Sequence, residues 1–197
     1  FIPPIPGIGN DGIFTMKTLT DCDKAKQYYD KMNPKNIVII GGGPIGIELA
    51  ENYRGLGKEV TIIEAATTIL GMYDPEISFE VASVLKNNGI KIETKTNVTN
   101  IEIVEKKIFL ELSTGEKVEA GMLFIVAGVR PEISLAKDAE LKIADCSAIA
   151  VDEFLTTSDK DIYAVGDAIA TRETMTGKII NSSLAGPANK QGRLAAD

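Results

Sequence analysis

The spacing of hydrophobic and polar residues changes several times along this chain, and each spacing predicts a different kind of element. Four consecutive apolar residues, Ile37–Ile40, and the apolar-rich segment 59–63 are typical of buried strands. The segment between them has a helical period that continues to Gly57. This order predicts a strand, a crossover helix and a second strand, which is the repeating unit of a parallel sheet.

Further along, the pattern predicts a second helix and then a different architecture. Residues 74–88 begin with a cap and a proline at the first helical position and continue as an amphipathic helix, which a strand at 90–94 follows. Between residues 100 and 118 the period is two, which predicts a small antiparallel meander. The buried run 122–126 then returns to the parallel sheet. We therefore expect an α/β, Rossmann-like doubly wound domain in which a β-meander replaces a crossover helix.

The two ends of the chain have weaker patterns. Near the N-terminus we expect a short strand at 13–19 and a polar helix at 23–32. Near the C-terminus we expect short strands at 148–152 and 161–167. A final helix at 187–196 opens with a proline at its first position.

The glycines between the first strand and the first helix of the crossover unit carry the chemistry. Gly41, Gly43 and Gly46 have the spacing G-x-G-x-x-G directly after a strand and at the start of a helix. Gly41 allows the tight turn, Gly43 lets a pyrophosphate approach the main chain, and Gly46 lets the helix lie close to the strand. The helix N-terminus attracts the phosphates without any basic side chain. A plain βα turn is the alternative for the glycines alone, but their context favours dinucleotide binding.

The second strand ends at Glu64, where a carboxylate can accept hydrogen bonds from the adenosine ribose. The same carboxylate repels a 2′-phosphate, and residues 65–68 contain no cation to reverse that preference, so we expect NAD(H) rather than NADP(H). Gly128 follows the buried strand at 122–126, where the nicotinamide half would pass. An ordinary strand-to-loop glycine is an equal alternative for Gly128.

Composition excludes several classes of function. The 197 residues are 44% hydrophobic and carry a formal net charge of −7, which argues against nucleic-acid or anionic-membrane partners. No apolar stretch has the length of a membrane span, and no signal peptide is visible. Cys22 and Cys146 form no CxxC pair, so we expect reduced thiols in a soluble cytoplasmic protein. The absence of histidine excludes a histidine base, a Ser-His-Asp triad and histidine-ligated metal.

The order of the motifs resembles that of the FAD-dependent pyridine nucleotide-disulfide oxidoreductases over essentially the whole chain. Residues 39–48 resemble the NADH-binding signature of this family, and residues 127–131 resemble the end of its NADH domain. Residues 157–167 are similar to its second flavin motif. Residues 184–193 look most like the branch that contains coenzyme A-disulfide reductases and water-forming NADH oxidases.

The resemblance implies roles for individual residues on the NADH side. Pro44 and Ile45 would hold the pyrophosphate together with Gly43, and Val98 would pack on the adenine. Glu48, in the first turn of the helix, either pairs with a group near the flavin or only favours the helix dipole, and the two interpretations have equal weight.

On the flavin side, Ala127 marks the end of the NADH domain, and Asp167 would hold the ribityl chain of FAD. The N-terminus of the last helix, at Ala185, would point at the flavin pyrimidine edge and stabilise negative charge there. Pro44 stands where the branch usually has an aromatic gate, which puts gating in doubt.

The resemblance also divides the chain. Residues 1–33 would be a connector and the end of the first FAD-domain half, residues 34–145 the NAD(H)-binding domain, and residues 146–197 an incomplete second FAD segment. The expected full-length parent adds the first FAD half with its redox cysteine, and a dimerisation domain. Cys22 and Cys146 match no redox position, so we expect the chain to be inactive alone. We also expect it to hold FAD weakly, because half of the flavin pocket belongs to the first FAD half.

Three functions are candidates for a chain with these motifs. The first is the NADH-binding core of a flavoprotein that passes hydride from NADH to FAD and on to a disulfide, a persulfide or dioxygen. The second is a stand-alone NAD(H)-binding or sensing module without catalysis. The third, a nicotinamide-only dehydrogenase, needs a proton-transfer group, and the chain has neither histidine nor a Tyr-x-x-x-Lys pair.

Overall fold

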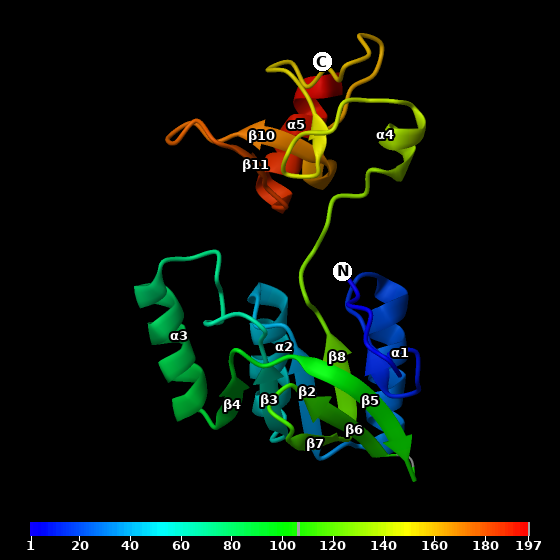
Figure 1. The fold of residues 1–197 in the computed structure, drawn as a ribbon, viewed down its shortest axis with the longest axis vertical. Coiled ribbons are helices and arrows are strands. Elements are labelled where there is room, and N and C mark those ends of the chain that lie inside the picture. Colours follow the sequence, from blue (N-terminus) through cyan, green and yellow to red (C-terminus); the bar gives the residue numbers. More distant parts are fainter. Residues whose placement is uncertain (106, 197) are drawn as a thin grey trace. The chain divides into compact units, whose positions relative to one another are not determined.

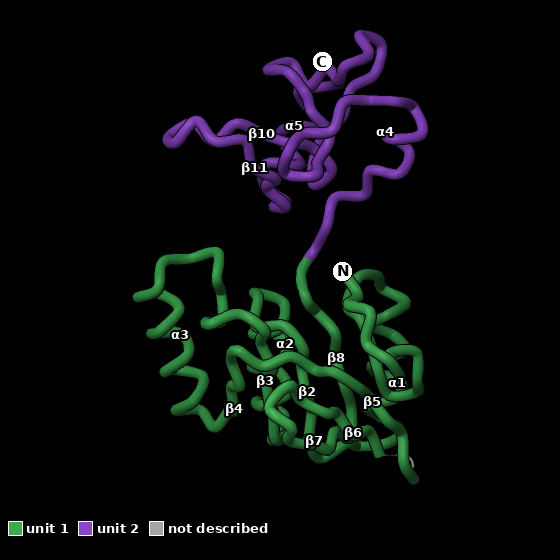
Figure 2. Tube along the Cα trace, viewed as in Figure 1, with its two compact units in different colours: residues 1–128 green, residues 129–197 purple. Residues whose placement is uncertain are grey.

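The computed structural model describes residues 1–105 and 107–196. The chain forms two compact units, unit 1 at residues 1–128 and unit 2 from residue 129 onward (Figure 2). Each unit has its own apolar core. The assignment of cofactor domains to the ranges 1–33, 34–145 and 146–197 stays a prediction.

Unit 1 is built on a parallel sheet, as the sequence predicts (Figure 1). The strand order is β1-β8-β2-β3-β4, and every neighbouring pair is parallel. The strands are β1 (Ile13–Phe14), β2 (Asn36–Ile40), β3 (Glu59–Ile63), β4 (Ile90–Glu93) and β8 (Met122–Ile125). Because β2 lies at the centre with a neighbour on each side, the segment that follows it stands in the middle of the carboxyl edge of the sheet.

Three helices cover one face of this sheet, namely α1 (Leu19–Met32), α2 (Pro44–Gly55) and α3 (Pro75–Asn87). Side chains alternate along a strand, so Ile37 and Ile39 of β2 point to the same face. Both are fully buried in one apolar cluster with Ala50 of α2 and Leu85 of α3. This shared cluster fixes the helices against the sheet.

The opposite face carries the antiparallel meander β5 (Val98–Val104), β6 (Lys107–Leu112) and β7 (Lys117–Ala120). The other two apolar residues of β2, Val38 and Ile40, join a second apolar cluster with Ile108 and Leu110 of β6. The meander thus takes the place of a layer of crossover helices, which confirms the predicted α/β class.

The N-terminal strand begins at the predicted residue but is shorter, and the helix begins earlier than predicted. α1 starts at Leu19, because Thr18 and Asp21 form a capping box. The Thr18 hydroxyl accepts from the Asp21 N–H at 3.2 Å, and the Asp21 carboxylate accepts from the N–H groups of Lys17 and Thr18 at 2.9 and 3.0 Å. These main-chain bonds lower the pKa of Asp21, and the bond from Lys17 has the largest effect. The expected strand at 13–19 is therefore cut to Ile13–Phe14.

Unit 2 is smaller and has a three-stranded sheet of order β11-β10-β9. β9 and β10 are parallel, whereas β10 and β11 are antiparallel. The elements are α4 (Ser134–Asp138), β9 (Ile149–Ala150), the 3₁₀ turn η1 (Gly166–Ala168), β10 (Ile169–Arg172), β11 (Ile179–Asn181) and α5 (Ala185–Ala196).

Three predictions for unit 2 were wrong in detail. Residues 161–167 form no strand among the described residues: Tyr163 makes an isolated bridge to Thr156, and Gly166 has φ +72°, which takes the chain into η1. α5 begins before Pro187, which is its third residue rather than its first. The predicted strand at 148–152 is only the two-residue β9, and β10 and β11 were not predicted.

Aromatic side chains pack between the sheet and the helices of unit 1, and the burial of one of them predicts how stability changes at alkaline pH. The Tyr53 ring lies 5.3 Å from Phe124 and 5.5 Å from Tyr29, and burial raises the pKa of Tyr53 to about 12. An unfolded tyrosine ionises near pH 10, so the unfolded chain loses a proton first, and stability falls as the pH rises from about 10 to 12.

We expect Tyr53→Phe to reduce this fall in stability, measured as urea midpoints against pH. Tyr73→Phe, which changes a half-exposed tyrosine, should leave the slope unaltered, and equal slopes for both variants would contradict the prediction.

Candidate functional site

The turn after β2 requires glycine at its first position. Gly41 has φ +114°, a conformation that L side chains rarely adopt. A Cβ on Gly41 would lie 2.4 Å from the Val126 carbonyl oxygen. The Gly41 N–H donates to the Ile63 carbonyl at 2.9 Å and so joins the turn to the end of β3. The turn is therefore held between the two strands that flank β2.

The start of α2 is packed closely on one side and open on the other. A Cβ on Gly46 would lie 2.0 Å from the Gly41 carbonyl oxygen, so the helix meets the turn at contact distance. Gly43 is the N-cap residue and Pro44 the first helical residue. No heavy atom of the described residues, apart from its two chain neighbours, lies within 4 Å of a Cβ built on Gly43. A ligand can therefore reach the main chain at Gly43, beside the N–H groups of the first turn.

Glu64, directly after β3, turns its carboxylate back to the glycine turn. One carboxylate oxygen, Oε2, accepts from the Gly42 N–H at 2.7 Å, and the other, Oε1, accepts from the Ala66 N–H at 2.7 Å. The side chain is half-buried. Each carboxylate oxygen can accept more than one hydrogen bond, so both can still accept from hydroxyl groups of a ligand.

The structure brings most of the predicted residues of unit 1 together. Around the carboxyl end of β2 it places Gly41, Gly43, Pro44, Ile45, Gly46 and Glu64. Ala127 and Gly128 follow β8, the neighbour of β2, and Gly128 is exposed with φ +96°.

Two residues of unit 1 lie differently from the expectation. Glu48 is exposed and lies beyond the first turn of α2. That turn contains no acidic residue, so a favourable contact of Glu48 with the helix dipole has no support. Val98 is 7% exposed and belongs to the apolar cluster between sheet and meander. Its contact with an adenine stays a prediction.

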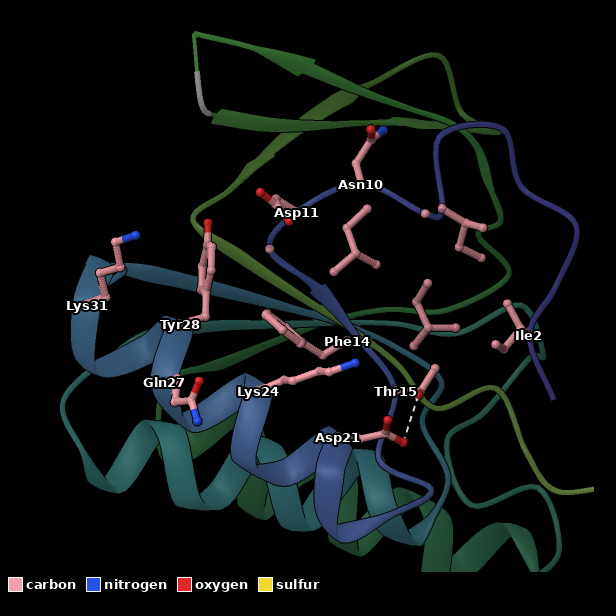
Figure 3. Close-up of a pocket in the computed structure, with 15 residues that line it drawn as sticks. Ile2, Asn10, Asp11, Phe14, Thr15, Asp21, Lys24, Gln27, Tyr28 and Lys31 are labelled. Carbon is pink, nitrogen blue, oxygen red and sulfur yellow. Dashed lines mark hydrogen bonds between the residues drawn. The ribbon is translucent and has the colours of Figure 1, made fainter.

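Two hollows of unit 1 lie away from the glycine turn. One of about 610 Å³ is bounded by the N-terminal segment and α1, with Lys24, Gln27 and Tyr28 on its wall (Figure 3). Another of about 840 Å³ lies between α2 and α3. Neither is lined by the glycine turn or by Glu64. In open α/β sheets ligands bind outside the carboxyl ends of the strands, which is where the glycine turn and Glu64 lie.

In unit 2, Asp167 lies on η1 with its side chain exposed. Its main chain is firmly held: the Asn181 side-chain amide donates to the carbonyls of Asp167 and Ile169 at 2.8 and 2.9 Å. The Gln191 side chain of α5 accepts from the Gly166 N–H at 2.8 Å. Asn181 and Gln191 were not predicted, because only the folded chain brings them to η1. Ala185, also predicted, is the first residue of α5.

Other kinds of site receive no support within the described ranges. No group of three or more histidine, cysteine, aspartate or glutamate residues there could hold a metal ion. Cys22 and Cys146 are free thiols. None of the described helices is both long enough and apolar enough to cross a membrane.

Comparison with known proteins identifies relatives over the whole chain. The model of the family "Pyridine nucleotide-disulphide oxidoreductase" matches residues 1–189. An NADH oxidase of Methanocaldococcus jannaschii is 33% identical over 196 residues, which are 99% of this chain and 43% of that protein.

Two solved structures are also similar. Reduced Bacillus anthracis CoADR-RHD has a TM-score of 0.95 and 37% identity, and the match covers 100% of this chain and 35% of the other. A NAD-dependent persulfide reductase from A. fulgidus has a TM-score of 0.93 and 35% identity, with 99% of this chain and 36% of the other covered. The chain thus spans less than half the length of each relative.

Proposed function

Because the chain belongs to the pyridine nucleotide-disulphide oxidoreductases, we propose that it is the NADH-binding core of a flavoprotein oxidoreductase. In this proposal unit 1 binds NADH in preference to NADPH. The complete protein passes hydride from NADH to FAD and on to a disulfide, a persulfide or dioxygen. The family name includes disulphide, and two relatives are named NADH oxidase and NAD-dependent persulfide reductase, which supports this range of acceptors.

The geometry of Glu64 carries the proposal. Its carboxylate is fixed by two main-chain N–H groups at 2.7 Å, beside a glycine turn whose open face is at Gly43. A pyrophosphate on the N-terminus of α2 therefore lies next to a carboxylate that can receive ribose hydroxyls. We assign the pyrophosphate to Gly43, Pro44 and Ile45.

Unit 2 fits part of a flavin site. The exposed Asp167 carboxylate is available to sugar-like hydroxyls, because Asn181 and Gln191 bond to the main chain of η1 and not to this carboxylate. Gly186 lies near the start of α5. Outside its local chain, no heavy atom of the described residues lies within 4 Å of a Cβ built there, so the edge of a flavin ring can approach. Bound FAD would supply the electron transfer. Asp167 would orient its polyol chain, and Ala185 and Gly186 would present N–H groups to it.

The test is a titration of the purified chain with NADH and with NADPH, in which the fluorescence of the coenzyme reports binding. We expect Glu64→Gln to weaken NADH binding by about 10- to 100-fold, because a hydrogen bond to a charged group contributes roughly 1.5–3 kcal/mol. NADPH should lose much less, because the repulsion of its 2′-phosphate is removed as well. The preference for NADH therefore shrinks.

Glu59→Gln is the matched control. Glu59 begins the same strand, at the end away from the turn, and its exposed ion pair with Lys35 at 3.3 Å contributes little to stability. The control makes the same charge change and should leave both affinities unaltered. Equal binding of NADH and NADPH by the unmodified chain, or binding of neither, would refute the proposal.

A binding or sensing module without catalysis is the alternative. It predicts the same titration, so the discriminating measurement is NADH oxidation by the complete protein loaded with FAD. Turnover with any of the three acceptors supports the oxidoreductase, whereas tight NADH binding without turnover supports the module.

A further inference from the structure

The loop that connects β3 to α3, residues 64–74, is tied to the glycine turn. The Leu70 N–H donates to the Gly42 carbonyl at 2.9 Å. Ile69 is 1% exposed, and its Cγ2 methyl would lie 2.6 Å from a Cβ on Gly42. The loop and the turn are therefore in contact through both main chain and side chain, directly beside the bond from Gly42 to Glu64.

A buried serine of α3 also bonds to this loop. Ser78 of α3 is 2% exposed, and its hydroxyl donates to the Leu70 carbonyl at 3.3 Å. A helical serine commonly donates to a carbonyl of the preceding turn instead. Ser83 of the same helix does this, with a bond of 2.9 Å to Phe79. Ser78 thus makes a bond outside its helix that Ser83 does not make.

Leu70 needs such support because of its main-chain conformation. Its φ of +50° is left-handed, which is unfavourable for a residue with a side chain. Both of its main-chain polar groups are used: the N–H bonds to Gly42, and the carbonyl accepts from the Tyr73 N–H at 2.9 Å as well as from Ser78. We call this set of bonds at Leu70 the loop latch.

We propose that Ser78 is a positioning residue for the coenzyme site, which acts through the loop latch and does not touch the ligand. The inference rests on the proposed binding of NADH by unit 1. The connection runs from the Ser78 hydroxyl through Leu70 to Gly42, whose N–H holds the carboxylate of Glu64. When the latch opens, the Gly42 carbonyl loses its bond from Leu70, the residue is held less firmly, and the carboxylate that bonds to the Gly42 N–H loses its orientation.

Loss of the Ser78 hydroxyl should therefore reduce the fraction of chains that are ready to bind. The apparent dissociation constant rises in inverse proportion to that fraction. Ser78→Ala leaves the Leu70 carbonyl with its bond from Tyr73, so no main-chain group becomes unpaired, and we expect the variant to fold.

The experiment compares Ser78→Ala with the matched control Ser83→Ala on the same helix. We expect the alanine at position 78 to weaken NADH binding by about 3- to 10-fold, the effect of one neutral hydrogen bond, and the control to match the unmodified chain. Hydrogen exchange of the Leu70 amide, followed by NMR without coenzyme, should accelerate in Ser78→Ala and not in Ser83→Ala. A serine that only stabilises α3 would not change the Leu70 amide selectively.

Several results would overturn the inference: an unchanged dissociation constant in Ser78→Ala, equal changes in both variants, or unaltered exchange at Leu70. Ser78→Cys keeps a side chain of similar size with a weaker donor, and it gives the same test if the alanine variant does not fold. Failure of the unmodified chain to bind NADH refutes the proposed function instead. The exchange comparison at Leu70 then still decides whether Ser78 holds the latch.

Discussion

Replacement of Gly41 by alanine is expected to lower the free energy of unfolding by about 3 kcal/mol or more, because it combines backbone strain with a steric clash. The residue has φ +114°, and the added methyl group would lie 2.4 Å from the carbonyl oxygen of Val126. Main-chain atoms at the centre of a parallel sheet cannot move away as the end of a side chain can. Urea denaturation of the purified variant measures the loss.

Gly55→Ala is the control for this prediction. Gly55 is the last residue of α2, and no heavy atom of the described part, its local chain apart, lies within 4 Å of a Cβ built there. Alanine is favoured over glycine in a helix by about 0.5–1 kcal/mol, so this variant should be equally or more stable. A Gly41 variant as stable as the Gly55 variant would contradict the geometry of the turn.

Replacement of Gly43 by alanine is expected to have the opposite profile, with stability retained and NADH binding weakened by about 10-fold or more. Its φ of −78° suits any residue. Apart from its chain neighbours, no heavy atom of the described residues lies within 4 Å of a Cβ built at this position. The added methyl group therefore causes no clash in the free protein. It would occupy the place to which we assign the pyrophosphate, at the N-terminus of α2.

The two glycine variants are best measured together, by urea midpoint and by NADH titration. Gly55→Ala serves again as the control, because it adds the same methyl group at the far end of the same helix. An NADH affinity of the Gly43 variant equal to that of the control would remove the pyrophosphate from this turn.

The parts of the fold that the sequence predicts well are those determined by neighbouring residues. The run Ile37–Ile40, the glycine spacing and the two-residue period of the meander are local signals, and each element appears near its predicted position. The start of α1 is also local, but its capping box uses Asp21 instead of the more usual glutamate or glutamine, so the sequence signal for it is weaker.

Unit 2 was predicted less well because its strands are short and depend on distant partners. β9 has two residues and pairs with β10, which follows only after a long irregular segment. A pattern of alternation cannot be recognised in two residues. The candidate site shows the same division: the glycines and Glu64 have a recognisable spacing, whereas the bonds of Leu70 and Ser78 depend on the path of a loop.

The arrangement of Glu64 has a consequence for binding kinetics. A carboxylate that two amides already orient before any ligand arrives loses little conformational freedom on association, so its ordering cost has been met during folding. Association should then proceed without a slow rearrangement, and variants that disturb this pre-organised group should differ mainly in how fast the coenzyme leaves.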